Sequence, residues 1–219
     1  MMKDGVAWYV PDDRFKYLPC KDWEEREISW VKERFPAGQL FIDIGANVGL
    51  YAMWLAGNFK KIVTVEPHPV NNYIIRKNIE LNGFTNISML EVAAWSRPEM
   101  LYFNQMHPND LASGAIVSGA PNEKAVVAPF LVLGVPLDDY DLNPDFIKMD
   151  IEGGEFEAIY GLVETMERTK PVMLIEIHQF TDGRTVGRFK DIMSGFGYDC
   201  TVATTKDGCF NYVFEHRGK

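Results

Sequence analysis

The sequence has few cysteines, and none stands in a pattern that binds metal or forms a disulfide framework. Cys20, Cys200 and Cys209 are odd in number and include no CxxC pair. The first residues also lack the charged, apolar and small-residue segments of a secretory leader. Because disulfide frameworks belong mainly to secreted chains, these absences predict a reducing, cytoplasmic location and cysteines that pack as apolar side chains.

Long apolar runs and an excess of basic residues are missing as well. No uninterrupted apolar segment approaches the roughly 20 residues that a membrane-spanning helix requires. The formal net charge is −9, with 22 Lys and Arg against 31 Asp and Glu. Nucleic-acid binding depends on clustered basic residues that neutralise phosphates, so we expect neither a membrane nor a nucleic-acid partner. A small substrate fits this composition better, and the oligomeric state stays open.

The chain also lacks a compositional break that would separate two domains. Its 219 residues are 47% hydrophobic and 24% charged, enough to bury one sizeable core. We therefore predict a single domain over residues 1–219. Residues 1–38 form a helical extension, in which Asp22 caps a helix over residues 22–35.

Short apolar segments alternate with segments of helical periodicity along the rest of the chain. Predicted strands cover residues 39–45, 60–67, 86–95, 145–154, 171–178 and 209–216. Predicted helices cover residues 49–58, 71–83, 155–168 and 185–197, and Asn82-Gly83 ends the second of them. This alternation predicts an α/β fold with a mostly parallel sheet, helices on both faces and an antiparallel C-terminal strand. Five prolines interrupt it in residues 97–137, where we expect an insertion of loops, with room for a hairpin, near the substrate.

The turn after the first predicted strand, in FIDIGANVGLYAMW (residues 41–54), lacks two of the three glycines of a dinucleotide-binding turn. A nicotinamide dinucleotide site requires G-x-G-x-x-G, but Asn47 and Leu50 occupy the second and third glycine positions. The pattern that remains places Asp43 before the turn, and Glu66 ends the next strand, 21 residues after Gly45. An acidic residue there can accept ribose hydroxyls, and Asp43 can hold the loop or receive an ammonium group. The pattern favours S-adenosylmethionine over NAD.

Five segments in this order, FIDIGANVGLYA, VEPHP, NIELNG, LDDY and FIKMDIEGGEFEAIYG, resemble the FkbM-type methyltransferases, a class I family that depends on S-adenosylmethionine. The resemblance extends from Gln39 to His178 and implies a Rossmann-like class I methyltransferase fold. It also implies cofactor contacts: Asp43, Gly45, Ala46, Asn47 and Gly49 at the amino acid end, Glu66 followed by Pro67 at the ribose, Val92, Ala93 or Ala94 at the adenine, and Asp150 close by.

The expected acceptor atom is oxygen. Exocyclic amine methyltransferases of this fold generally carry Asn or Asp, then Pro-Pro and an aromatic residue, after the fourth strand, whereas this chain has Asp150-Ile151-Glu152-Gly153. The family resemblance implies hydroxyls on sugars, polyketides, other small molecules or glycans. Two alternatives stay open, namely an RNA or protein methyltransferase on the same fold, and a cofactor-binding protein that has lost catalysis.

Charged residues end the fourth and fifth predicted strands. Period-two alternation places Lys148 with Asp150, and Glu176 with His178, on shared faces of neighbouring strands. Charged groups are scarce inside parallel strands, so these residues indicate either a buried ion pair, such as Lys148 with Glu176, or catalysis. We expect catalysis at Asp150 and His178, with Glu152, Glu176 and Lys148 as further candidates.

The acceptor hydroxyl must lose a proton, and two arrangements could provide for this. A neutral His178 imidazole with the ordinary pKa of about 6.5 would be a suitable general base. A divalent cation held by Asp150, Glu152, Glu176 and His178 would instead lower the pKa of the acceptor. We favour His178 without a metal, because charged clusters are more often paired internally than metallated.

Overall fold

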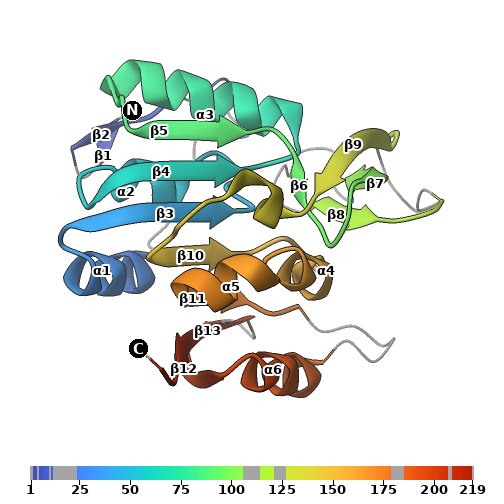
Figure 1. The fold of residues 1–219 in the computed structure, drawn as a ribbon. Helices are drawn as coiled ribbons and strands as arrows, with labels where there is room; N and C mark the ends of the chain where they lie inside the picture. Colours follow the sequence, from blue (N-terminus) through green and yellow to red (C-terminus); the bar gives the residue numbers. More distant parts are fainter. Residues whose placement is uncertain are drawn as a thin grey trace.

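A seven-stranded sheet organises the fold, in the order β12-β13-β11-β10-β3-β4-β5 (Figure 1). The computed structural model describes residues 2–3, 5–9, 11, 24–105, 114–120, 127–178, 185–206 and 209–218. Neighbouring strands from β11 to β5 run parallel, whereas β13 is antiparallel to both β11 and β12. The predicted mostly parallel sheet with an antiparallel C-terminal strand is confirmed.

The strands of this sheet are β3 (Gly38–Ile44), β4 (Phe59–Val65), β5 (Ile87–Leu90), β10 (Phe146–Met149), β11 (Val172–Glu176), β12 (Tyr198–Lys206) and β13 (Cys209–His216). The helices are α1 (Glu25–Arg34), α2 (Leu50–Trp54), α3 (Pro69–Asn82), α4 (Glu155–Tyr160), α5 (Val163–Thr169) and α6 (Val186–Gly195), with a 3₁₀ helix η2 at Leu137–Tyr140. None of the described helices is both long and apolar enough to cross a bilayer.

Helices cover both faces of the sheet, as the sequence predicts. One buried cluster joins β3, β10 and β11 to α4, α5 and α6, for example through Ile42, Phe156 and Phe189. A second cluster joins the opposite face to α1, α2 and α3, with Val31 and Ile75 among its members. Alternation along each strand sends successive side chains to opposite faces, so a strand buried on both sides must be apolar throughout.

Three phenylalanines lie in the second cluster, and a fourth, partly buried one packs against them. The rings of Phe41, Phe59 and Phe146 lie with centroids 5.2–6.3 Å apart, and Phe35, just after α1, lies 5.2 Å from Phe146. These separations are favourable for aromatic pairs, which add to the free energy of simple burial. The cluster therefore fixes β3, β4 and β10 against each other at one end.

Residues 97–137 are more regular than the loops and hairpin that the prolines suggest. They contain β7 (Glu99–Gln105), β8 (Gly114–Val117) and β9 (Phe130–Val135), which join β6 (Ala93–Ala94) in a second sheet of order β6-β9-β7-β8. Leu101 and Phe103 point inward and are buried, whereas Met100 is exposed, so period-two alternation is present. Pro98, Pro129 and Pro136 lie directly before or after β7 and β9, whereas Pro108 and Pro121 lie outside the described residues. The number of prolines hid the alternation in the sequence.

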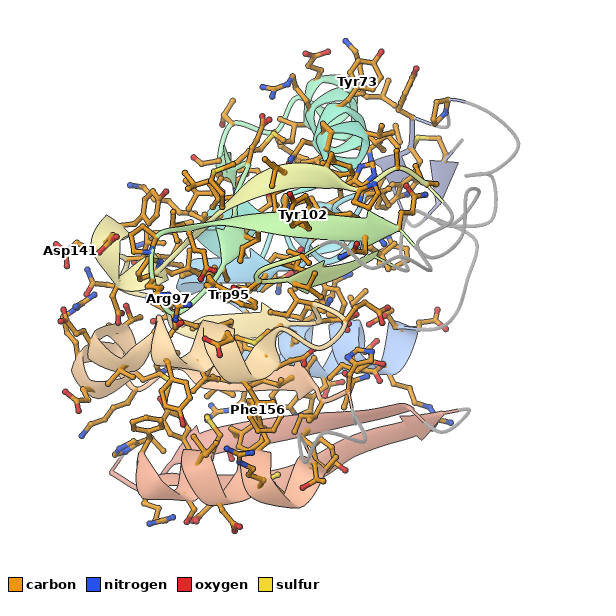
Figure 2. All side chains as sticks on the ribbon, turned by 90° about the vertical axis from the view of Figure 1, so that its right-hand side faces the viewer. Tyr73, Trp95, Arg97, Tyr102, Asp141 and Phe156 are labelled. Atoms are coloured by element: carbon orange, nitrogen blue, oxygen red, sulfur yellow. The ribbon has the colours of Figure 1, made fainter. Side chains whose placement is uncertain are left out.

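The second sheet lies beside the carboxyl ends of the main parallel strands (Figure 1). Figure 2 views it from that side, with Tyr102 on its outward face and Trp95 at its base. The prediction of a single strand over residues 86–95 is therefore wrong, because the segment forms two strands in different sheets. It breaks after Leu90, and Trp95 donates a backbone hydrogen bond to Val135 in the second sheet.

Other element boundaries differ for local reasons. The predicted helix over residues 155–168 is two helices, because Gly161 lies against the Trp95 backbone where a Cβ would approach the carbonyl oxygen to 2.0 Å. The predicted helix over residues 49–58 is longer than the observed α2, which covers Leu50–Trp54. Strand β12 was not predicted. The Gly83 cap of α3 is confirmed by its left-handed φ of 66°. Asp22 and Cys20 lie outside the described residues.

The N-terminal segment packs against α3. Strands β1 (Met2–Lys3) and β2 (Val6–Ala7) pair with each other, and the side chain of Asn82 exchanges hydrogen bonds of 2.7 Å with the Ala7 backbone. Asn78 accepts a 2.8 Å hydrogen bond from the Tyr9 amide. Within the described residues, the predicted extension is thus a strand pair followed by α1 rather than helix alone.

The aromatic cluster gives a direct stability prediction. Phe146→Ala should lower the free energy of unfolding by about 3–5 kcal/mol, the range for large-to-small changes in a packed core, because Phe146 is fully buried. Leu131→Ala, at a position 53% exposed on β9, is the control and should change it by less than about 0.5 kcal/mol. Equal midpoint shifts for the two variants in urea denaturation would contradict this description of the core.

Candidate active site

The candidate site lies at the carboxyl ends of β3 and β10. Strand order reverses between these two neighbours, since the chain builds outward from β3 to β5 and then returns through β10. In open α/β sheets ligands bind at such a reversal, beyond the ends of the strands. Register pairs Asp43 on β3 with Lys148 on β10, so the sequence-predicted residues of both strands meet here.

The turn after β3 needs glycine at its first position. Gly45 has a φ of +75°, and a Cβ there would lie 1.8 Å from the backbone oxygen of Asp150. Gly49 has a φ of +86° and forms the N-terminal cap of α2. Asn47, with a φ of 51°, adopts the same left-handed region, which Asn tolerates better than most residues. The glycines therefore let the loop approach β10 closely and enter α2 at once.

Glu66, at the end of β4, holds this loop. One carboxylate oxygen accepts a 2.8 Å hydrogen bond from the Asn47 amide, and the other accepts one of 2.9 Å from the His68 amide and one of 3.3 Å from Asn71. Burial raises the pKa of Glu66 to about 7, although the His68 and Asn47 amides favour its charged form. Both oxygens are thus already committed to the protein, and a ribose would add to these contacts.

Asp43 is the buried polar residue with the least compensation in the site. It is 1% exposed, and neither carboxylate oxygen has a hydrogen-bond partner of good geometry. Burial raises its pKa to about 6, against the opposing effect of the Lys148 charge and the nearby Ala52 amide. A buried acceptor without a donor is costly, so Asp43 is suited to receive a ligand's hydrogen-bond donors.

Lys148 is the buried cation of the site. Its ammonium lies 3.4 Å from Asp150 Oδ2 and 5.1 Å from the centre of the Tyr51 ring. Burial alone would lower the pKa of Lys148, but the charges of Asp150, Asp43, Glu24 and Glu176 outweigh it and raise the pKa. The close ion pair of Lys148 is therefore with Asp150, and Glu176 acts on it as a more distant charge.

His178 lies among carboxylates from three segments. Its Nδ1 is 3.1 Å from Glu155 Oε1, and its Nε2 is 3.2 Å from Glu152 Oε2 and 3.7 Å from Glu176 Oε1. Burial would lower the pKa of His178, yet the hydrogen bond to Glu155 and the charges of Asp150, Glu155 and Glu152 raise it to about 9. The expectation of a neutral imidazole with an ordinary pKa is therefore wrong in the metal-free protein.

Glu152 titrates closer to neutral pH. It follows β10 in a left-handed conformation, with a φ of 53°. Burial, first, and then the charges of Asp150, Glu176 and Glu155 raise its pKa to about 7, while His178 opposes them. Its side chain is 40% exposed, compared with 22% for His178 and 17% for Glu176. Glu152 is thus the carboxylate of this group most accessible to an incoming molecule.

Three residues of the site were missed from the sequence. Glu155 is fully buried and orients His178, and Glu24 accepts a hydrogen bond from Tyr51, whose ring lies beside Lys148. Glu155 stands in the first turn of α4, where an acidic residue is favoured simply by the helix dipole, so its sequence position carried no separate signal. Tyr51 lies in the apolar segment YAMWL, whose aromatic and aliphatic residues have the ordinary pattern of a helix that packs in the core.

The remaining predicted residues lie at β6 and just after the ends of β3 and β4. Ala93 and Ala94 form β6 and are buried, while Val92 is half-buried and packs on the first core cluster. Ala46 is buried in the turn, and Pro67 is half-buried between β4 and α3. Near the turn after β3, the buried atoms Asp43 Oδ1 and Oδ2 and Asn47 Oδ1 have no hydrogen-bond partner among the described residues. Such a set fits a polar ligand with several donors.

Comparisons with known proteins agree with this geometry. Residues 43–200 match the family described as the methyltransferase FkbM domain. A probable cobalt-precorrin-6B C(15)-methyltransferase (decarboxylating) from Sulfolobus acidocaldarius is 27% identical over 54% of this chain and 61% of its own. The methyltransferase FkbM structure from Methylobacillus flagellatus is 22% identical, with a TM-score of 0.58, over 82% of this chain and 44% of that one.

A putative methyltransferase from Streptococcus mutans, in complex with SAH, is 10% identical with a TM-score of 0.57 over 89% of this chain and 98% of that one. The low identities make these structures similar in fold only, and the fold is Rossmann-like. The chain spans less than two thirds of the length of the Sulfolobus relative and less than half of the length of the Methylobacillus FkbM structure.

The charge state of His178 can be measured. In chelator-treated protein, NMR titration should give His178 a pKa near 9, and Glu155→Gln should lower it by removing one hydrogen-bonded carboxylate. Because the folded-state pKa is raised, the charged ring stabilises the fold fully below about pH 6.5, and this contribution disappears as the pH rises through about 9.

His68 serves as the internal control for this titration. Burial lowers its pKa below the ordinary value, so the two histidines should separate in opposite directions in the same spectrum. A His178 pKa at or below the ordinary value of about 6.5 would contradict the described cluster.

Proposed function

The chain belongs to the FkbM methyltransferase family, and we propose that it uses S-adenosylmethionine to methylate a hydroxyl oxygen on a small molecule, sugar or glycan. The observation that carries the cofactor assignment is Asp43, a buried carboxylate without a good hydrogen-bond donor, beside a turn held close to β10 by Gly45. An α-ammonium group would supply the hydrogen-bond donors that Asp43 lacks. The single-domain organisation and a cytoplasmic location remain predictions of this proposal.

The cofactor would extend from β3 to β5. Asp43, Gly45, Ala46, Asn47 and Gly49 would surround its amino acid end. Glu66, supported by Pro67 and the loop amides, would accept ribose hydroxyls at the end of β4. Val92, Ala93 and Ala94 would offer apolar contact to the adenine at the junction with the second sheet. Asp150 would lie beside the amino acid end, since its backbone oxygen contacts the Gly45 turn.

The proton of the acceptor hydroxyl would pass to Glu152. In methyl transfer the acceptor oxygen forms the new bond to carbon, the carbon–sulfur bond breaks with its electrons left on sulfur, and the hydroxyl proton leaves. A base with a pKa near the working pH is best suited to receive it. Glu152 meets that condition with a pKa raised to about 7 and the most exposed side chain of the group. His178, which is cationic in the metal-free protein, would orient Glu152 instead of accepting the proton.

Oxygen is preferred to nitrogen because the segment after β10 is Asp150-Ile151-Glu152-Gly153, which has Ile-Glu-Gly where amine methyltransferases carry Pro-Pro and an aromatic residue. The Sulfolobus relative is named for transfer to carbon, so carbon is the second candidate acceptor. An RNA acceptor is disfavoured by the net charge of −9. A protein acceptor and a non-catalytic cofactor-binding role are the further alternatives that the experiments below separate.

Calorimetry tests the cofactor. The protein should bind S-adenosylhomocysteine and not NAD, because the loop lacks the glycines that a pyrophosphate requires. Glu66→Ala should weaken S-adenosylhomocysteine binding by about 1–3 kcal/mol, the cost of leaving hydroxyl and amide donors unpaired. Glu80→Ala, on the exposed side of α3, is the control and should bind normally. Binding of NAD without a response to S-adenosylhomocysteine would refute the cofactor assignment.

Methyl transfer tests the acceptor. With radiolabelled S-adenosylmethionine, hydroxyl-bearing sugars and phenols should gain label, whereas primary amines, bulk RNA and denatured protein should not. With an accepted hydroxyl compound, Glu152→Gln should lower turnover by ~10²–10⁴-fold, the usual value of general-base catalysis, without changing S-adenosylhomocysteine affinity. Glu164→Gln on α5 is the control, since its side chain is exposed. Labelling confined to RNA, protein or carbon would overturn the oxygen assignment.

A further inference from the structure

Three residues beside the proposed methyl-transfer site have the donor set and spacing of a cation site. Ligand atoms of Asp150, Glu176 and His178 all lie within 4.8 Å of one another. His178 Nε2 and Glu176 Oε1 are 3.7 Å apart, too far for a hydrogen bond. Two ligands at about 2.1 Å from one ion, at angles of 90–120°, lie roughly 3.0–3.6 Å from each other. A small inward movement would therefore place both atoms on one ion.

The histidine ring is held as metal-binding histidines usually are. Its Nδ1 is 3.1 Å from Glu155 Oε1, an oxygen that also accepts a 3.0 Å hydrogen bond from the Gly153 amide. A carboxylate oxygen only accepts, so Nδ1 is the donor in this pair. Nε2 is then the atom directed at Glu176 and Glu152. Metal-ligating histidines commonly donate their second ring nitrogen to a carboxylate in this way.

The burial of Glu155 supports the cation site separately from the spacing of the ligand atoms. Its side chain is completely buried, its carboxylate is directed at His178, and its Oε2 has no hydrogen-bond partner. A buried, incompletely paired carboxylate is costly unless positive charge lies close by. Within the described part of the chain, the ends of β10 and β11 and the start of α4 together present four carboxyl groups to two basic side chains, those of Lys148 and His178. Among these described groups, acidic side chains outnumber basic ones.

We propose that Asp150, Glu176 and His178 bind a divalent cation, with Glu155 as the residue that positions His178. Two carboxylates and one imidazole suit Mn²⁺ and similar ions, and three protein ligands leave positions open. A bound cation lowers the pKa of a hydroxyl that ligates it, which fits an oxygen acceptor and leaves Glu152 free. The inference about acceptor chemistry rests on the proposed function, whereas the cation site itself rests on the geometry alone.

Mn²⁺ binding to the full chain, followed by electron paramagnetic resonance, tests the site. The wild-type protein should bind one Mn²⁺ saturably, and Glu176→Gln and His178→Ala should each abolish that binding. Glu155→Gln should weaken it by ~10–100-fold, the usual effect of changing a group that orients a metal ligand. Glu167→Gln, at an exposed position on α5, removes the same charge outside the cluster and should bind Mn²⁺ as the wild type does.

Circular dichroism and S-adenosylhomocysteine calorimetry on the same preparations separate the possible failures. Native spectra with lost Mn²⁺ binding in both ligand variants support the site. Absence of saturable Mn²⁺ binding in the wild type, or Mn²⁺ binding as tight as the wild type's in Glu176→Gln and His178→Ala, overturns it. If S-adenosylhomocysteine still binds in that case, only the cation site is refuted. If Mn²⁺ binds as expected and S-adenosylhomocysteine does not, the cofactor assignment fails and the cation site stands.

Discussion

The candidate site depends on one buried cation, the ammonium of Lys148. It lies at the point where strand order reverses, paired in register with Asp43 and 3.4 Å from Asp150. Without it, the buried carboxylate of Asp43 and the half-buried carboxylate of Asp150 would lack this positive charge, and burial of uncompensated charge is among the most costly events in folding. Lys148 therefore allows acidic groups to be concentrated at this edge of the sheet, where they can meet a cationic cofactor and an acceptor.

Glycine and glutamate then give the site its shape. Gly45 lets the loop after β3 contact the backbone of Asp150, and Glu66 fixes the other side of that loop through the Asn47 amide. The second sheet contributes β6, so the predicted adenine contacts are positioned by residues far along the chain, through pairing with β9. Beyond β10 and β11, His178 holds the cluster of carboxylates together through contacts of 3.1–3.7 Å. Loop, second sheet and cluster all converge on the same strand ends.

The sequence predicted those parts whose determinants are local. Apolar runs identified β3, β4, β10 and β11, the Asn82-Gly83 pair ended α3, and period-two alternation placed Lys148 beside Asp150. The parts that depend on distant contacts were not predicted. The prolines of residues 97–137 hid the alternating pattern of the second sheet. The break between α4 and α5 falls at Gly161, which lies against the Trp95 backbone. The raised pKa of His178 follows from Glu155, 23 residues away, which local sequence cannot reveal.

The most direct test of this account is a crystal structure of the protein with S-adenosylhomocysteine. In it, the α-ammonium group should lie within hydrogen-bonding distance of Asp43, the ribose hydroxyls should lie at Glu66, and the sulfur should face Asp150 and Glu152. S-adenosylhomocysteine bound away from the ends of β3 and β4, or bound there with Asp43 still lacking a donor, would contradict it.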